Sequence, residues 1–387
     1  MWHFNTKKLT ILPAMELTLN SRELAQAVSI CASASARKTA MPILYNILLT
    51  AEDSKLYVGA TDGDLSIKMS VPAKVKSPGS ITIKATLLND VLRELPDTEL
   101  KFSLGDRGRV DIACGGAKVK LVGQAADEFP GLSGTALTPK GKIAARDIVE
   151  MINKTLYSTS PDETRIAIAG VCFEYNATEK VVTLVATDGH RLSLIKRKGQ
   201  SFSAKNKVVL SKRSITELKK ILSAESELPV SLDVIDGYLI CETPTAKFAA
   251  KLVDADFPSY DKVVPAGSSS TASVNRKSFI SSLRRAALLS PEKSKASKML
   301  FKEGELIVTS LAPDIGEATE KLEIEYTGSP TTVGFNAQYL LEFCEACGDA
   351  ETVRLELNGS TGAAKLCTDA DESFFGVIMP MRLNDAA

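Results

Sequence analysis

The chain has 387 residues, enough for two to three domains, and a hydrophobic fraction of 44% is ample for packed cores. Basic and acidic residues number 47 each, so no overall charge draws the chain to nucleic acid or to a membrane. No apolar run approaches the roughly 20 residues that span a bilayer, which excludes a helical membrane protein and predicts a cytoplasmic one.

The first regular pattern in the chain is a strand that begins at Met15. Residues 1–14 contain Lys7 and Lys8, but the apolar stretch that follows is too short for a secretory signal. We therefore predict that residues 1–14 are a disordered N-terminal extension.

A short strand that leads directly into an amphipathic helix occurs six times along the chain. The first apolar helix residues of these units lie 60 to 67 positions apart, and alternating strands fill the space between the helices. The six units are Leu17 to Ala34, Ile81 to Leu95, Ile143 to Tyr157, Val208 to Leu222, Val274 to Leu289 and Val333 to Cys347.

Two longer signatures repeat at about one domain length. Ala60-Thr61-Asp62-Gly63 returns as Ala186-Thr187-Asp188-Gly189, 126 positions later, and Asp127-Glu128-Phe129-Pro130 is echoed by Asp254-Ala255-Asp256-Phe257-Pro258. Degenerate third copies stand near Thr309–Asp314 and Ser373–Pro380. The repeat predicts three similar domains, at 15–135, 136–266 and 267–387.

These patterns together predict the fold class. Each domain consists of two half-repeats of strand, helix and then several strands, which is an α+β arrangement with the sheets in one layer and the helices in another.

The seven cysteines are scattered among apolar neighbours, as buried thiols of a reducing compartment are. Cys344 and Cys347 have the C-x-x-C spacing, but they fall in a helical pattern with no second pair and almost no histidine nearby. We predict neither a metal site nor a cofactor.

Basic residues gather on particular predicted helices. Lys212, Arg213, Lys219 and Lys220 stand against the single acid Glu217, and Arg276, Lys277, Arg284 and Arg285 have no acid between them. They fit solvated helix faces, but their recurrence on equivalent helices also fits a surface that meets DNA phosphates without reading bases.

Asp188 and His190 permit a catalytic interpretation, because histidine is the usual general base near neutral pH. A hydrolase or nuclease would also need a nucleophile that partners this pair, a metal cluster or a phosphate-binding glycine loop, and the sequence indicates none of them. The earlier copy at Asp62-Gly63 lacks the histidine. We therefore predict a turn that is structural first, and no enzyme.

Four ordered motifs on the threefold repeat make the chain resemble the β sliding clamps of bacterial DNA polymerase III over residues 15–383. The motifs are Ala186-Thr187-Asp188-Gly189-His190-Arg191-Leu192, Phe257-Pro258-Ser259-Tyr260, Arg285-Ala286-Ala287-Leu288-Leu289-Ser290-Pro291-Glu292-Lys293 and Met379-Pro380-Met381-Arg382-Leu383.

The resemblance implies the DNA-clamp fold and a non-enzymatic processivity factor of DNA replication. Such a factor is a head-to-tail homodimer that encircles double-stranded DNA, with helices inside the ring and sheets outside. Its implied partners are the DNA polymerase III catalytic subunit, the clamp loader, translesion polymerases and mismatch-repair proteins. A peptide-binding scaffold that does not act on DNA remains a third interpretation, beside the clamp and the enzyme.

The resemblance also implies a partner-peptide pocket between domains 2 and 3, with apolar walls, a few polar groups and methionines. Its predicted residues are Ile168, Thr187, Gly189, His190, Arg191, Leu192, Pro258, Lys262, Val263, Val377, Met379, Pro380, Met381 and Arg382. Asp261-Lys262 stands where the family often has basic residues, and the last four residues, 384–387, extend the chain next to the pocket.

Further positions carry over to DNA and to the dimer seam. Lys38, Arg165, Lys212 and Arg213 match positions that contact or approach DNA. Val119 matches an edge-strand residue that meets Leu288 and Leu289 of the other subunit, although these two leucines equally fit the buried face of a helix.

Overall fold

The computed structural model describes residues 15–36, 38–199, 202, 207–224, 229–290, 295–312, 314 and 316–382. They form two compact units: one contains the residues up to Ala145 together with Thr216–Lys251, and the other contains Arg146–Ile215 and the residues from Leu252 onward. The predicted extension at 1–14 and the chain end at 384–387 lie outside the described residues. The three domain limits stay a prediction.

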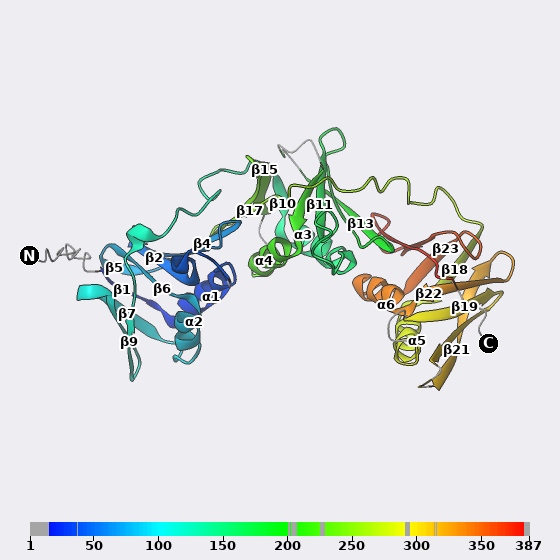
Figure 1. The fold of residues 1–387 in the computed structure, drawn as a ribbon, viewed down its shortest axis with the longest axis horizontal. Helices are drawn as coiled ribbons and strands as arrows, with labels where there is room; N and C mark the ends of the chain where they lie inside the picture. Colours follow the sequence, from blue (N-terminus) through cyan, green and yellow to red (C-terminus); the bar gives the residue numbers. More distant parts are fainter. Residues whose placement is uncertain are drawn as a thin grey trace, which may run out of the picture. The chain divides into compact units, whose positions relative to one another are not determined.

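The first unit contains two antiparallel sheets (Figure 1). One has the order β5-β1-β7-β8-β9 and the other the order β10-β15-β16-β17-β4-β3-β2-β6. The elements of this unit are β1 (Met15–Asn20), α1 (Ser21–Ala32), β2 (Asn46–Glu52), β3 (Lys55–Thr61), β4 (Leu65–Pro72), β5 (Lys74–Ser77), β6 (Gly79–Lys84), α2 (Ala85–Arg93), β7 (Glu99–Leu104), β8 (Arg109–Cys114), β9 (Ala117–Val122), β10 (Lys142–Ala144), β15 (Pro229–Ile235), β16 (Tyr238–Glu242) and β17 (Ala246–Lys251).

The second unit is organised around one sheet of twelve strands, in the order β14-β11-β12-β13-β25-β24-β23-β18-β21-β20-β19-β22. Helix α4 (Lys212–Ser223) begins in this unit and continues into the first. The other elements are α3 (Ala145–Asn153), β11 (Gly170–Asn176), β12 (Val181–Thr187), β13 (Arg191–Lys198), β14 (Val208–Ser211), β18 (Ser270–Asn275), α5 (Arg276–Leu288), β19 (Ala296–Lys302), β20 (Glu305–Ala312), β21 (Gly316–Thr327), β22 (Thr331–Asn336), α6 (Ala337–Ala346), β23 (Thr352–Leu357), β24 (Ala364–Cys367) and β25 (Phe374–Ile378).

All six predicted strand–helix units are confirmed, and the junction between strand and helix has a recurring local cause. Asn20 is the last residue of β1, and its side chain accepts hydrogen bonds from the first-turn amides of Arg22 and Glu23. Asn275 and Asn336 cap α5 and α6 in the same way. An extended residue with a short polar side chain satisfies the free amides of a helix start, so a strand can pass into a helix without a loop.

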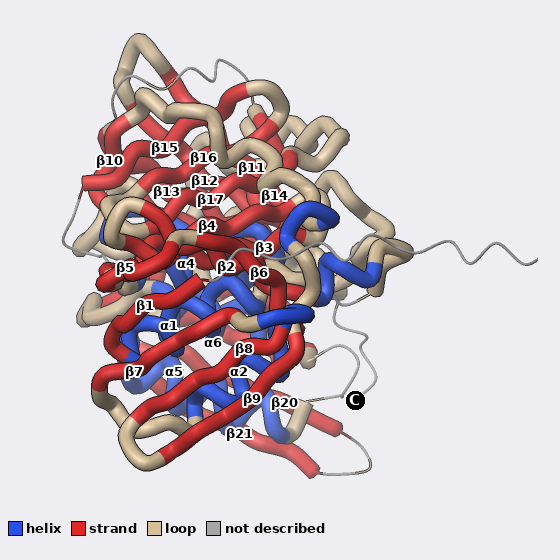
Figure 2. The backbone as a smooth tube through the Cα atoms, turned by 90° about the vertical axis from the view of Figure 1, so that its left-hand side faces the viewer, coloured by secondary structure: helices blue, strands red, loops and turns tan. Residues whose placement is uncertain are grey.

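The helices cover one face of the sheets. In the first unit, α1 and α2 pack against each other behind the strands β1, β7 and β8 (Figure 2), and Leu24, Val28 and Leu88 are fully buried there. In the second unit, α5 and α6 lie side by side on the strands that follow β18 (Figure 1). This layering is the predicted α+β arrangement.

Strands β13 and β25 join parts of the chain that are almost 200 residues apart. They pair from Arg191 with Ile378 to Ile195 with Phe374, and the amide of Met379 donates to the carbonyl of His190 at 2.9 Å. This pairing places the Asp-Gly turn beside the terminal strand.

The edges of the sheets among the described residues include strand β9 and one side of β21. β9 is the last strand of its five-stranded sheet. β21 pairs with β20 along Gly316–Glu323, but it pairs with β18 only from Ile324 onward, so the first part of β21 has an unpaired side. Open edges of this kind are templates for pairing with another chain.

The basic surplus on α5 is smaller than the sequence suggests. The guanidinium of Arg284 pairs with Glu345 of α6 at 2.7 Å, and that of Arg285 pairs with Glu320 of β21 at 2.6 Å. Both carboxylates come from elements distant in sequence, which explains why the local pattern missed them.

Candidate functional site

The turn between β12 and β13 is closed by its own side chains. The hydroxyl oxygen of Thr187 accepts from the amide of Gly189 at 3.1 Å, and Oδ1 of Asp188 accepts from the amides of His190 and Arg191 at 2.9 and 3.0 Å. Gly189 has φ +94°, a conformation that L-residues with a side chain rarely adopt. The predicted structural turn is confirmed, and it joins the antiparallel strands β12 and β13.

Arg191 projects from this turn and is almost fully enclosed, with its side chain 9% exposed. Its Nε donates to Oδ2 of Asp188 at 3.0 Å, its Nη2 donates to the carbonyl of Tyr157 at 2.6 Å, and its Nη1 donates to Glu342 of α6. The guanidinium carbon also lies 4.3 Å from the ring centre of Tyr339. Two carboxylates therefore balance the charge of the guanidinium, and the face of the Tyr339 ring packs against it.

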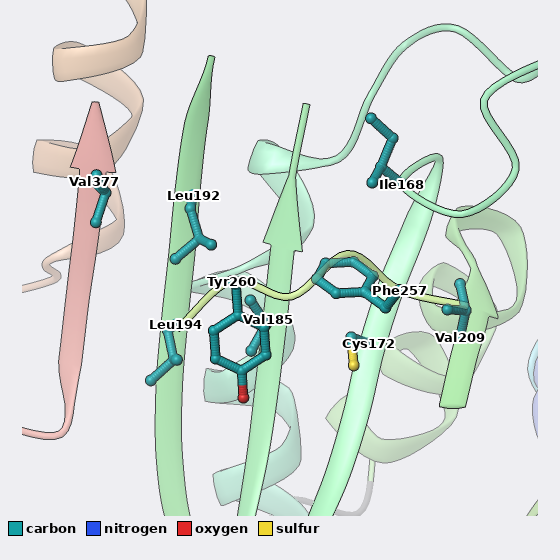
Figure 3. Close-up of a cluster of buried hydrophobic side chains, with 9 residues drawn as sticks. All are labelled: Ile168, Cys172, Val185, Leu192, Leu194, Val209, Phe257, Tyr260 and Val377. Atoms are coloured by element: carbon teal, nitrogen blue, oxygen red, sulfur yellow. The ribbon is translucent and has the colours of Figure 1, made fainter. Parts of the chain in front are cut away.

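A second segment, Phe257–Tyr260, crosses the strands of the same sheet. Figure 3 shows the rings of Phe257 and Tyr260 over Cys172 and Val185, and the two rings meet edge to face with centroids 6.3 Å apart. The hydroxyl of Tyr260 donates to Glu174 at 2.6 Å. Burial and this carboxylate raise the pKa of Tyr260 far above its ordinary value of 10, so the phenol stays a hydrogen-bond donor.

The turn, the crossing segment and β25 enclose a cavity of about 170 Å³. Its walls are mostly apolar, and its polar groups come mainly from the turn and from Arg165. The lining residues are Arg165, Ile168, Thr187, Gly189, His190, Arg191, Leu192, Pro258, Ser259, Tyr260, Val263, Val377 and Met379. An apolar cavity with few polar groups is suited to binding side chains of a ligand rather than to chemistry on it.

The part of the chain that the structure describes offers no metal centre, because no three His, Cys, Asp or Glu side chains there are grouped to hold an ion. All seven cysteines are free and buried. Burial raises the pKa of Cys347 to about 12, which keeps this thiol of the C-x-x-C pair protonated. Within the same described ranges, no helix combines the length and apolar character needed to cross a membrane.

Three family models of the DNA polymerase III β subunit match consecutive parts of the chain. The N-terminal domain model matches residues 15–133, the central domain model 142–259 and the C-terminal domain model 261–382. The β sliding clamp of Caulobacter vibrioides is 32% identical over 336 residues, which cover 85% of this chain and 90% of that protein. The chain belongs to the β sliding clamp family.

Solved structures of the family agree with this assignment. The sliding clamp of Pseudomonas aeruginosa bound to griselimycin superposes with a TM-score of 0.89 at 27% identity, over 96% of this chain and all of that one. The Caulobacter crescentus β sliding clamp gives a TM-score of 0.89 at 29% identity, over 96% of this chain and 99% of that one. The predicted DNA-clamp fold is confirmed.

Members of this family are non-catalytic processivity factors of DNA polymerase III, and the chain is a β sliding clamp in that sense. The hydrolase or nuclease interpretation of Asp188 and His190 is therefore wrong. The structure supplies the physical reason, because both carboxylate oxygens of Asp188 hold the turn and Arg191.

Ten of the fourteen residues predicted for the clamp's peptide pocket line the cavity. The other four, Lys262, Pro380, Met381 and Arg382, are outside its lining. The amide of Met381 instead donates to the carbonyl of Gly334 at 2.8 Å, which ties the end of the chain to β22. That the cavity binds peptides stays a prediction.

Three lining residues were not predicted for this pocket. Arg165 was assigned to DNA, but its Nη1 donates to the carbonyl of Asp188 at 3.0 Å and its guanidinium lies against Gly189. Ser259 and Tyr260 belong to the Phe-Pro-Ser-Tyr motif that also supplies Pro258. Their position in that motif, directly after Pro258, was the signal that could have identified them.

The remaining predicted residues lie as follows. Lys38 is exposed after α1, and Lys212 and Arg213 are exposed in the first turn of α4. Val119 is half-buried on the edge strand β9, and Leu289 is half-buried after α5. Leu288 is 75% exposed, so its alternative interpretation as a core residue of the helix is wrong.

Proposed function

We propose that the chain forms a head-to-tail homodimeric ring around double-stranded DNA and binds its partners through the cavity beside the Asp-Gly turn. The partners are the DNA polymerase III catalytic subunit, the clamp loader, translesion polymerases and mismatch-repair proteins. Their common site is a pocket of predicted domains 2 and 3, and the ring works in the cytoplasm, where replication takes place in bacteria.

The distribution of exposed apolar side chains carries this proposal. Eight large hydrophobic residues are exposed in the described part of the chain. Val263 and Met379 line the cavity, and Ile166 is two residues from Ile168 in its wall. Exposed apolar groups concentrated at one place mark an interaction site, whereas scattered ones do not.

Three more of these eight residues support the dimer. Val122 ends the open edge strand β9 and is 77% exposed, while Leu288 and Leu311 belong to α5 and β20. The open part of β21 follows β20 directly. A β9 edge from one subunit and a β21 edge from another would satisfy each other's backbone groups.

Charge supports the same pairing. The exposed face of β9 carries Lys118 and Lys120, and that of the open part of β21 carries Glu317 and Glu323 against the single base Lys321. Opposite charges on adjacent strands stabilise a pair of strands, and like charges destabilise it. A β9 to β21 contact is therefore favoured over β9 to β9.

The DNA contacts fit a ring rather than a tight binder. Net charge is zero, and much of the basic surface of α5 is neutralised by Glu320 and Glu345. Lys38, Lys212 and Arg213 would then contact phosphates without reading sequence. Weak contacts of this kind permit sliding when topology keeps the protein on the duplex.

A retention experiment tests the ring. We expect the protein, loaded by its clamp loader onto a nicked circular plasmid, to stay with the DNA during gel filtration and to be lost once the plasmid is linearised. The double variant Lys118→Glu/Lys120→Glu should sediment as a monomer and not be retained. Equal salt-sensitive loss from circular and linear DNA would mark an ordinary binder, and no retention on either would favour a scaffold that does not act on DNA.

A matched pair of variants tests the pocket. Griselimycin is the ligand of the P. aeruginosa relative, and in the C. crescentus relative polyethylene glycol occupies a region proposed to tether the β-motif. We expect Val263→Asp to weaken griselimycin and a fluorescent polymerase-derived peptide at least about ten-fold, because it places a charge in an apolar wall. Leu87→Asp on α2, with exposure of 43% against 44% for Val263, should leave both unchanged.

A further inference from the structure

We propose that Glu342 of α6 is a positioning residue of the pocket. It touches no ligand; it holds Arg191, and Arg191 holds the turn Thr187–Leu192 that forms one wall. The inference rests on the proposed function, since it concerns the same pocket, and it adds a residue outside the lining to the determinants of affinity.

The guanidinium of Arg191 is held by groups of the protein itself. Although Arg191 borders the cavity, three of its nitrogens donate to Asp188, Glu342 and the carbonyl of Tyr157. Its charge is balanced by the two carboxylates, and only 9% of its side chain is exposed. To serve a ligand, the guanidinium would have to leave a carboxylate in a poorly solvated place, which is costly. Arg191 therefore acts as part of the wall.

The copy of the turn at Thr61–Leu65 is an internal control. There, Thr61 accepts from the amide of Gly63 at 3.1 Å, and Asp62 accepts from the amides of Asp64 and Leu65 at 3.0 and 2.8 Å. Those bonds match the ones at Thr187 and Asp188, yet Leu65 stands where Arg191 would be. The turn thus closes without an arginine, so the ion pairs of Arg191 serve another purpose.

The ion pair of Arg191 with Glu342 connects the turn to α6. Glu342 accepts from Arg191 through Oε2 and from the side chain of Gln338, one turn earlier in α6, through Oε1 at 2.8 Å. One residue further on, the ring of Phe343 stacks on Phe374 of β25 with centroids 5.0 Å apart. The helix is therefore fixed to the strand that carries Val377, and Glu342 extends from it to the opposite wall.

The two walls thus share a support. β25 provides Val377, the turn provides Thr187 to Leu192, and α6 contacts β25 through Phe343 and the turn through Glu342. Loss of the Glu342 carboxylate leaves Asp188 as the one carboxylate bound to Arg191 in the described structure and removes the partner of its Nη1. A wall that must be ordered when the ligand arrives binds that ligand more weakly than one already in place.

The affinity of the full chain for griselimycin, measured by isothermal titration calorimetry, tests the inference. We expect Glu342→Gln to weaken binding about three- to ten-fold, in the lower part of the range of couplings within one hydrogen-bond network. Glu345→Gln, on the same helix but paired with exposed Arg284, should leave affinity unchanged. Unchanged affinity in Glu342→Gln would overturn the proposal.

A double-mutant cycle separates positioning from a general structural effect. If Glu342 acts through Arg191, then Arg191→Gln/Glu342→Gln should bind no more weakly than Arg191→Gln alone. An added loss in the double variant would overturn the assignment. If Glu342→Gln does not fold, Gln338→Ala replaces it with an expected loss of about two-fold, and no loss there would count equally against the proposal. Failure of the unaltered protein to bind would instead contradict the pocket itself.

Discussion

The turns at Thr61–Leu65 and Thr187–Arg191 have the same backbone hydrogen bonds in different surroundings. In both, a threonine hydroxyl accepts from the glycine amide, an aspartate carboxylate accepts from the next two amides, and glycine has a positive φ of 102° or 94°. The fifth residue differs: Leu65 is a buried apolar side chain, and Arg191 is a buried cation held by Asp188 and Glu342.

The two copies of the Asp-Gly turn differ in their contacts with distant parts of the chain. The turn itself depends on bonds within five residues, and it forms in either copy. The pocket needs the turn to be tied to α6 and β25, and only the second copy has those ties. If the cavity binds partners as proposed, one long-range ion network makes a structural turn part of a binding site.

The largest expected effect comes from making the second turn resemble the first. Arg191→Leu leaves Asp188 buried without its cation, and we expect a loss of about 3–5 kcal/mol in the free energy of unfolding. Urea denaturation followed by circular dichroism measures it. Arg354→Leu breaks ion pairs with exposed Asp369 and with Glu356, which keeps Lys365 as a partner, and should cost less than about 1 kcal/mol. If Arg191→Leu and Arg354→Leu lowered the free energy of unfolding equally, the proposed difference between the two turns would be contradicted.

A smaller effect concerns pH. Strand β13 continues from the second turn to Arg197, which forms a cluster with Lys154, Glu150 and Asp371 at 2.6 to 2.8 Å. Burial alone would raise the pKa values of both carboxyls, but hydrogen bonds from Lys154 and Arg197 outweigh it and hold them below their ordinary values of 4.5 and 3.8.

A carboxyl group whose pKa is lower in the folded state than in the unfolded state stabilises the fold at pH values above its unfolded-state pKa. This stabilisation is lost as the pH falls from the unfolded-state pKa through the folded-state pKa. We therefore expect the second unit to lose free energy of unfolding as the pH falls from 5 to 3, by less than about 2 kcal/mol, because Glu150 is 39% exposed and solvent screens its ion pairs. Hydrogen exchange measures this locally, with amides of β13 losing protection before those of β4. Lys154→Met should flatten the pH dependence, and a parallel loss in β4 and β13 would contradict the role of the cluster.

The smallest expected effect comes from alanine substitutions of Gly63 and Gly189, which should lower stability alike but differ in their effect on ligand binding. Gly63→Ala and Gly189→Ala should each cost about 1 kcal/mol, because both place a side chain at positive φ. A Cβ at Gly63 meets nothing within 4 Å, whereas one at Gly189 lies 3.1 Å from the Arg165 guanidinium in the pocket wall. Only Gly189→Ala should weaken griselimycin, as measured by calorimetry; weaker binding by Gly63→Ala would contradict the assignment of the pocket.

Local patterns in the sequence determined the elements and the family. The six strand–helix units, the Asp-Gly turn and the three-part repeat depend on periodicity, caps and turn residues that act within a few positions. Ten of the cavity's lining residues were identified before the structure, because the motifs that carry them resemble those of sliding clamps. Their binding role stays a prediction.

Only the tertiary structure decided how the charged residues are used. Arg165 was assigned to DNA and lies in the pocket wall, Arg191 is part of a buried network, and the cations of α5 find their acids on α6 and β21. The second carboxylate partner of Arg191, Glu342, lies 151 residues away. A hydrogen-bonded turn can be predicted from neighbouring residues, but an ion pair depends on which distant elements the packed sheet brings together.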